Sequence, residues 1–198
     1  RFAPASKTLA EATTDETGHF TMSFPRLAAQ GTGMAKVVAR VGGMGIAWQP
    51  LNVKATDVEA QLVLPPEEAA RGRLVDAEGR PATQVKLSIR SATPRAEEGA
   101  FLINLWASFD RPPAAWPPAV VTDAQGRFTI RGVPAGHGVG LRVTGDDQFA
   151  PQELLLNSGL PEERGERDGT YRSQIKNSDE GEEVVFDLAP ARFFEGVV

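Results

Sequence analysis

Short stretches in which apolar and polar residues alternate recur along this chain of 198 residues. An alternation with a period of two is typical of a β-strand with one buried face. Glycine and proline, 20 and 15 residues respectively, fall between these stretches and mark turns. The pattern therefore predicts an all-β protein, built as a sandwich or a barrel. The clearest stretches are 70–76, 85–89 (Val85, Leu87 and Ile89 inward), 139–143 (Val139, Leu141 and Val143 inward) and 184–188 (Val184, Phe186 and Leu188 inward).

Two further stretches carry predictions about strand pairing. Residues 119–133, AVVTDAQGRFTIRGV, are predicted to form a hairpin with Asp123 and Gly126 in its turn. Phe128 and Ile130 would then point inward. Residues 149–156, FAPQELLL, are predicted to form an edge strand, because a proline cannot donate a hydrogen bond to a neighbouring strand.

The chain contains an internal repeat. TDETGHFTM at 14–22 matches TDAQGRFTI at 122–130, and LPPEEAARGRLV at 64–75 matches LAPARFFEGVV at 188–198. The order of the landmarks is kept while their separation varies, which indicates one module with loops of different length. In the first copy, the residues expected to point inward are Phe20, Met22 and Phe24. A further match joins Arg40-Val41 to Arg142-Val143.

The repeat predicts three segments. Residues 1–66 hold the C-terminal part of one module, residues 67–190 form a complete module, and residues 191–198 begin a third. Within the complete module, residues 91–118 are interpreted as an insertion. A second long stretch, 157–183, precedes the last strand. Loops of this length are uncommon unless they serve a purpose or are disordered.

The motifs of the complete module resemble those of the carboxypeptidase regulatory-like domain. The family pattern runs Gly-x-Val-x-Asp-x-x-Gly-x-Pro, then Thr-Asp-x-x-Gly-x-Phe, then Pro-x-Gly. The resemblance implies a prealbumin-like, Ig-like sandwich of seven strands in Greek-key order, present here as a tandem repeat. It also implies a spacer, adhesion or ligand-binding module of a bacterial cell-envelope or extracellular protein. The matching residues are Gly72, Asp76, Gly79, Pro81, Thr122, Asp123, Gly126, Phe128, Pro134 and Gly136, with Leu74 at the valine position.

Composition excludes several functions. The formal net charge is −5, and lysine and arginine are scattered among aspartate and glutamate, which makes nucleic acid an unfavourable partner. The chain has no cysteine, so disulfides and thiolate zinc sites are excluded. No apolar run approaches the roughly 20 residues of a membrane-spanning helix.

Catalytic motifs are not found in the sequence. Only His19 and His137 are present, and both are expected to be structural or exposed. The glycine-rich stretches GTGMAK and GGMGIAW lack the Gly-Lys-Ser/Thr ending of a phosphate loop and are interpreted as tight turns. The repeated TDxxG phrases offer too few carboxylates for calcium. We therefore expect no enzyme activity, no cofactor and no metal.

The candidate ligand-binding residues are Trp106, Trp116 and Phe109, all within the 91–118 insertion. Aromatic rings on loops at the end of a sandwich can stack on sugars or anchor a protein. The alternative is that these residues belong to an apolar cluster that caps the sandwich, with 97–109 forming a short helix. The sequence leaves both interpretations open.

The expected function is that of a non-catalytic spacer or interaction module in a larger bacterial surface, envelope or signalling protein. Its partners would be neighbouring modules of the same polypeptide. The alternative is a carbohydrate- or peptide-binding module that uses the 91–118 loop to hold a glycan or protein ligand.

Overall fold

The computed structural model of the chain describes residues 8–24, 35–52, 58–94, 105–106, 112–156, 164–167, 171–176 and 183–191. Within these ranges the chain is all-β and contains no helix. The strands are β1 (Ala35–Ala39), β2 (Ala47–Leu51), β3 (Ala70–Val75), β4 (Lys86–Pro94), β5 (Leu105–Trp106), β6 (Val120–Val121), β7 (Arg127–Ile130), β8 (His137–Val143), β9 (Gln152–Leu156), β10 (Arg164–Arg167), β11 (Tyr171–Lys176) and β12 (Val184–Asp187).

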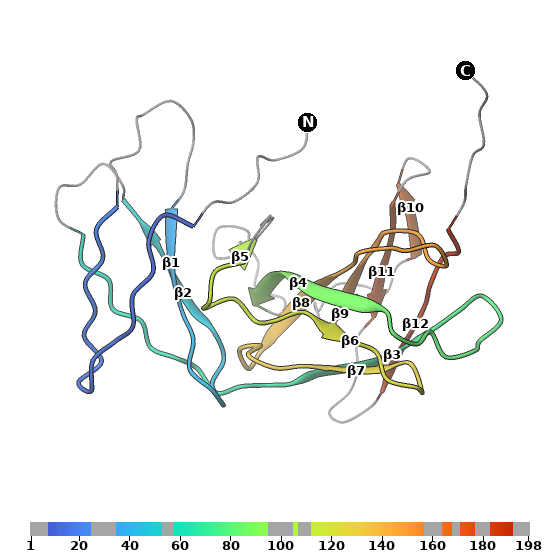
Figure 1. The fold of residues 1–198 in the computed structure, drawn as a ribbon, viewed down its shortest axis with the longest axis horizontal. Helices are drawn as coiled ribbons and strands as arrows, with labels where there is room; N and C mark the ends of the chain where they lie inside the picture. The colour runs from blue at the N-terminus through green and yellow to red at the C-terminus, as the bar shows by residue number, and fades with distance from the viewer. Residues whose placement is uncertain are drawn as a thin grey trace, which may run out of the picture.

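The strands are arranged in three sheets (Figure 1). The larger sheet has the order β10-β11-β9-β8-β4-β5, and β6 also pairs with β4. The smaller sheet has the order β12-β3-β7, and β1 and β2 form a separate antiparallel hairpin. Most pairs are antiparallel, but β12 runs parallel to β3 and β11 runs parallel to β9. The first and last strands of the 67–190 segment are therefore direct neighbours.

The larger sheet and the smaller β12-β3-β7 sheet face each other across one apolar core, as in a β-sandwich. Leu74, Phe128 and Phe186 come from the smaller sheet and are 0–4% exposed. Leu87 and Leu141 come from the larger sheet and are fully buried in the same cluster. Burying one such side chain contributes about 1.5–3 kcal/mol. The alternating stretches of the sequence supply the inner faces of both sheets.

The inward positions expected from alternation are confirmed in this segment. Each expected inward side chain is at most 6% exposed. These residues lie in or directly beside β4, β8 and β12: Val85, Leu87, Ile89, Val139, Leu141, Val143, Val184, Phe186 and Leu188. The prediction of strand 70–76 is also confirmed by β3.

Two predictions of strand pairing are wrong. Residues 119–133 do not form a hairpin, because β6 pairs with β4 in the larger sheet and β7 pairs with β3 in the smaller one. Thr122, only 1% exposed, secures this crossing: its hydroxyl donates to Ala82 O at 2.7 Å and accepts from Val85 N at 2.9 Å. Residues 152–156 do not form an edge strand either, since β9 pairs with both β8 and β11. Pro151 precedes the strand and so interrupts no backbone hydrogen bond.

The two long loops contain strands that the alternation pattern does not indicate. The expected 91–118 insertion begins inside β4, which continues to Pro94 after a register shift between Ile89 and Ser91. Leu105 and Trp106 form β5, which contradicts the short helix at these two positions. The 157–183 stretch contains β10 and β11, which extend the larger sheet.

A turn of one geometry occurs three times, at Asp15, Asp76 and Asp123. In each, the aspartate N–H donates to the carbonyl four residues later at 2.9 Å, and its carboxylate accepts two backbone N–H bonds. The glycine three residues after each aspartate has a φ between 75° and 85°. This left-handed conformation favours glycine. The shared Asp-x-x-Gly spacing thus encodes one local structure.

These hydrogen bonds affect two of the carboxyl groups. The Thr17 hydroxyl and then the His19 N–H hold the pKa of Asp15 below its ordinary value. Burial by itself would raise the pKa of Asp76, but hydrogen bonds from Arg80 and Glu78 outweigh it and lower the pKa. The Arg80 guanidinium contacts the Asp76 carboxylate at 2.6 Å. Both turns therefore favour the charged aspartate.

The N-terminal part of the chain is less buried than the 67–190 segment. Phe20, Met22 and Phe24 alternate with exposed residues as expected, but they are half-buried rather than buried. The β1–β2 hairpin lies between residues 8–24 and the sandwich (Figure 1).

Candidate functional site

Two of the three predicted ligand-binding residues, Trp116 and Trp106, lie within the described part of the chain. Trp116 is 5% exposed, and its indole N–H donates to Ile89 O at 3.1 Å. Its ring therefore packs in the core and offers no exposed face on which a ligand could stack. Trp106 lies in β5, opposite Ser91 of β4. Phe109 lies outside the described residues, so ligand binding by Trp106 and Phe109 stays a prediction.

The most developed site is the junction between the β1–β2 loop and the sandwich. Gly45 N donates to Pro65 O and Ile46 N donates to Gly132 O, both at 2.9 Å. Residues 65–68 form the linker that leads into β3. Within this linker, Glu68 N donates to Val133 O and Pro66 O accepts from Ala135 N, also at 2.9 Å. We call residues 44–46, 65–68 and 132–135 the junction. Backbone hydrogen bonds join these three segments, so the linker at 65–68 is fixed to both neighbours.

Close packing at the junction depends on a glycine. A Cβ atom at Gly45 would lie 2.6 Å from Pro134 Cα and 3.1 Å from Pro66 O. Backbone atoms cannot move aside as a flexible side chain can, so only glycine fits here without displacement. The next residue, Ile46, is 1% exposed and belongs to the core cluster of the 67–190 sandwich. A residue of the first segment thus completes the core of the second.

Polar contacts surround this apolar centre. Arg131 Nη1 lies 3.0 Å from Glu67 Oε1, and the Glu67 side chain is only 9% exposed. Arg40, after β1, donates from Nη1 to Trp116 O at 3.2 Å. Glu11 accepts a hydrogen bond from Ala114 N at 3.0 Å. Glu11, Arg40 and the linker residue Glu67 therefore each bind the sandwich.

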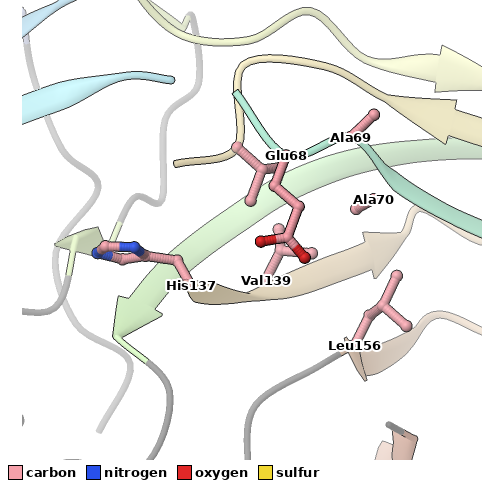
Figure 2. A pocket seen from close by; sticks show the side chains of 7 residues that line it. Glu68, Ala69, Ala70, His137, Val139 and Leu156 are labelled. Atoms are coloured by element: carbon pink, nitrogen blue, oxygen red, sulfur yellow. The ribbon is translucent and has the colours of Figure 1, made fainter. Parts of the chain in front are cut away.

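A shallow hollow lies beside the junction and is lined by Glu68, Ala69, Ala70, Val133, His137, Val139 and Leu156 (Figure 2). Gly136 N donates to Glu68 Oε2 at 3.0 Å. Figure 2 shows the Glu68 carboxylate over Val139, while the imidazole of His137 extends to one side. The hollow has room for about one water molecule, so it is far too small for an ordinary small-molecule ligand.

His137 lies next to the junction and contacts residues on both sides of it. Its Nδ1 lies 3.0 Å from Ala135 O, and its ring meets that of Trp48 edge to face, with centroids 5.5 Å apart at 81°. Such aromatic pairs add about 0.5–1.5 kcal/mol to the burial of their surfaces. Because Trp48 belongs to β2, this contact also joins the two segments.

We searched the described residues for groups that could bind a metal or act as nucleophiles. These residues contain no group of three or more histidine, cysteine, aspartate or glutamate side chains that could hold a metal ion. The residues that line the hollow include one carboxylate and one imidazole but no serine, threonine, cysteine or lysine nucleophile. What the arrangement does chemically is hold two segments together through apolar burial and backbone hydrogen bonds.

A backbone contact of the junction recurs at the other end of the sandwich. Met44 pairs with Pro66, and Phe149 pairs with Pro190 in the same antiparallel manner. In each case the next residue donates to the carbonyl before the proline at 2.9 Å, from Gly45 to Pro65 and from Ala150 to Ala189. The β1–β2 and β8–β9 loops therefore meet the end of their own segment in the same way.

The sequence pattern does not indicate the junction. GGMGIAW predicts only a tight turn, although Gly45 is required by packing and the following Ile46 is buried. An apolar residue directly after the glycines of this turn is the signal that could have indicated it.

No protein-family model matches this chain, and no curated protein matches it. Within the described ranges, no helix is both long enough and apolar enough to cross a membrane.

Proposed function

We propose that this chain is a non-catalytic spacer built from successive copies of one β-sandwich module, which holds its neighbours at a fixed orientation in a larger protein. The observation that carries the proposal is Ile46, which extends from the β1–β2 loop and is 1% exposed in the core of the following sandwich. A flexible tether would need no such residue.

The tandem arrangement is supported by local structure that recurs along the chain. The Asp-x-x-Gly turn forms at Asp15 and again at Asp123, at equivalent places in the repeated phrase. The contact between a loop and a proline forms at Pro66 and again at Pro190. These recurrences favour residues 1–66 and 67–190 as two copies of one module, with residues 191–198 beginning a third.

The proposed module is prealbumin-like with Greek-key connections, as in the carboxypeptidase regulatory-like domain. Apart from the strands of the two long loops, residues 67–190 contribute β3, β4, β6, β7, β8, β9 and β12. Three lie in the smaller sheet and four in the larger, a division that supports the proposal. A place in a bacterial cell envelope or extracellular protein belongs to the same proposal.

Substitution of Gly45 tests whether the junction fixes the orientation of the two modules. In Gly45→Ala the new Cβ meets the backbone of Pro134, so we expect the β1–β2 hairpin to separate from the sandwich. ¹⁵N relaxation would then give the two parts different rotational correlation times. The matched control is Gly42→Ala in the same loop, where a Cβ meets nothing within 4 Å. A Gly45→Ala protein whose two parts still tumble as one body would contradict the proposal.

A further inference from the structure

We propose that the outer face of the β12-β3-β7 sheet binds an extended acidic peptide whose carboxylates stand at alternate residues. This interaction is separate from the spacer function. The face carries four arginines, Arg71 and Arg73 from β3, Arg127 from β7, and Arg131 immediately after β7. We call these four residues the arginine face.

Strand register places these side chains together. Arg73 is directly opposite Arg127, and Arg71 is opposite Thr129. The alternate residues of the same strands, such as Phe128, point into the core, so the arginines point outward. Arg127 and Arg131 side chains are 54% and 74% exposed.

The arrangement places like charges opposite each other. Like charges directly opposite each other on neighbouring strands are destabilising. The pair Arg73 and Arg127 nevertheless occurs in a chain whose formal net charge is −5. An external anion would offset this repulsion, as carboxylates of the chain already do in part.

The face already holds carboxylates, which identifies the chemistry it favours. Glu183 Oε1 lies 2.6 Å from Arg127 Nε, and Glu67 Oε1 lies 3.0 Å from Arg131 Nη1. Glu183 directly precedes β12, and Arg127 is in β7. Because β3 lies between these two strands, the Arg127–Glu183 ion pair crosses over β3. Arg73 donates from Nε to Gln125 O at 2.9 Å, whereas the Arg71 side chain makes no hydrogen bond or ion pair with another described residue. Each guanidinium has five N–H donors, so each can donate hydrogen bonds to further carboxylates.

The spacing of the arginines on β3 matches an extended peptide. Arg71 and Arg73 are two residues apart on one strand, which separates them by roughly 6.6–6.8 Å. An extended peptide presents side chains on one face at the same interval, so alternate glutamates match the two guanidinium groups. The other outward residues of these strands include Thr129, Val185 and Asp187, so one further carboxylate lies on this face. The described part of the face has no aromatic ring for stacking on bases or sugars.

The test compares two peptides of equal composition on the intact chain by isothermal titration calorimetry. One alternates glutamate and threonine over eight residues, and the other has four glutamates followed by four threonines. We expect the alternating peptide to bind several-fold more tightly and its affinity to fall as salt is added, because exposed charges are screened. Amide chemical-shift changes should concentrate at residues 71–73 and 127–131.

Paired variants show whether the arginine face is responsible. Arg71→Gln/Arg73→Gln should weaken binding about fivefold, the size expected for two exposed ion pairs. The matched control, Arg90→Gln/Arg142→Gln, removes the same charge from β4 and β8 of the other sheet and should change affinity less than about twofold. Far-UV circular dichroism checks that both proteins fold.

Three results would overturn the inference. Equal weakening in the two double variants would indicate attraction by overall charge. Equal affinity for both peptides would remove the role of spacing. Tighter binding of a single-stranded DNA oligonucleotide with the same charge would identify a different class of partner.

Discussion

The N-terminal segment and the 67–190 sandwich share the same turn but differ in how well they bury the strand that follows it. Asp15 and Asp123 make the same set of backbone hydrogen bonds. Phe128, which follows the Asp123 turn, is 4% exposed between two sheets. Phe20, which follows the Asp15 turn, is only half-buried. The turn is therefore encoded locally, while burial depends on strands that come from distant parts of the chain.

This difference explains how the two segments cooperate. A two-stranded hairpin is marginally stable by itself in water. The β1–β2 hairpin instead packs Val38 and Trp48 against the core of the sandwich and inserts Ile46 into it. The less buried segment thus gains stability from the more buried one.

The largest expected effect comes from removing the phenylalanine that follows each of the two turns. Phe128→Ala should lower the free energy of unfolding by about 3–5 kcal/mol, because it leaves a cavity between the sheets. Phe20→Ala should cost less than about half as much, since its side chain is only half-buried. Urea unfolding followed by far-UV circular dichroism measures both. Equal losses would mean that the two phenylalanines are equally buried in solution.

A smaller difference is expected between the turn glycines. Gly18 and Gly126 both have positive φ, so alanine at either position costs about 1–2 kcal/mol. At Gly126 a Cβ would also collide with the Leu74 carbonyl oxygen, whereas at Gly18 it meets nothing within 4 Å. Gly126→Ala should therefore be the more destabilising. Gly79→Ala, with positive φ and open space, serves as the control and should resemble Gly18→Ala in urea unfolding.

The smallest expected effect is a dependence of stability on pH. The folded-state pKa of Asp76 lies below its ordinary value of 3.8, so its charged form stabilises the fold above that value. This contribution is lost as the pH falls through the folded-state pKa. Asp76→Asn should therefore lower stability near pH 6 and reduce its further decline between pH 4 and pH 2. An unchanged acid dependence of the urea midpoint would refute this role.

Sequence alternation was sufficient to identify the core of the sandwich but not the pairing of its strands. Leu87, Leu141 and Phe186 were identified because a period of two records which face is buried. Alternation does not record which strand lies next to which. The hairpin expected at 119–133 was therefore wrong, since the hydroxyl of Thr122 binds the 82–85 region and keeps β6 in the other sheet.

The candidate sites were less predictable because they assemble from distant residues. The junction combines segments near residues 45, 66 and 133, and its closest contact involves Gly45, which has no side chain to indicate a role. The arginine face combines Arg71 with Arg127, which appear as scattered charges in the linear sequence. Only the register of β3 against β7 brings them together.

The parallel pairing of β12 with β3 has a mechanical consequence. Four residue pairs from Val184–Gly72 to Asp187–Val75 join the last strand of the sandwich to its first. The chain enters β3 at its amino end and leaves β12 at its carboxyl end, and these ends lie on opposite sides of the paired region. Tension along the polypeptide pulls the two strands past each other, so the bonds between them bear load in shear and resist together instead of opening one after another.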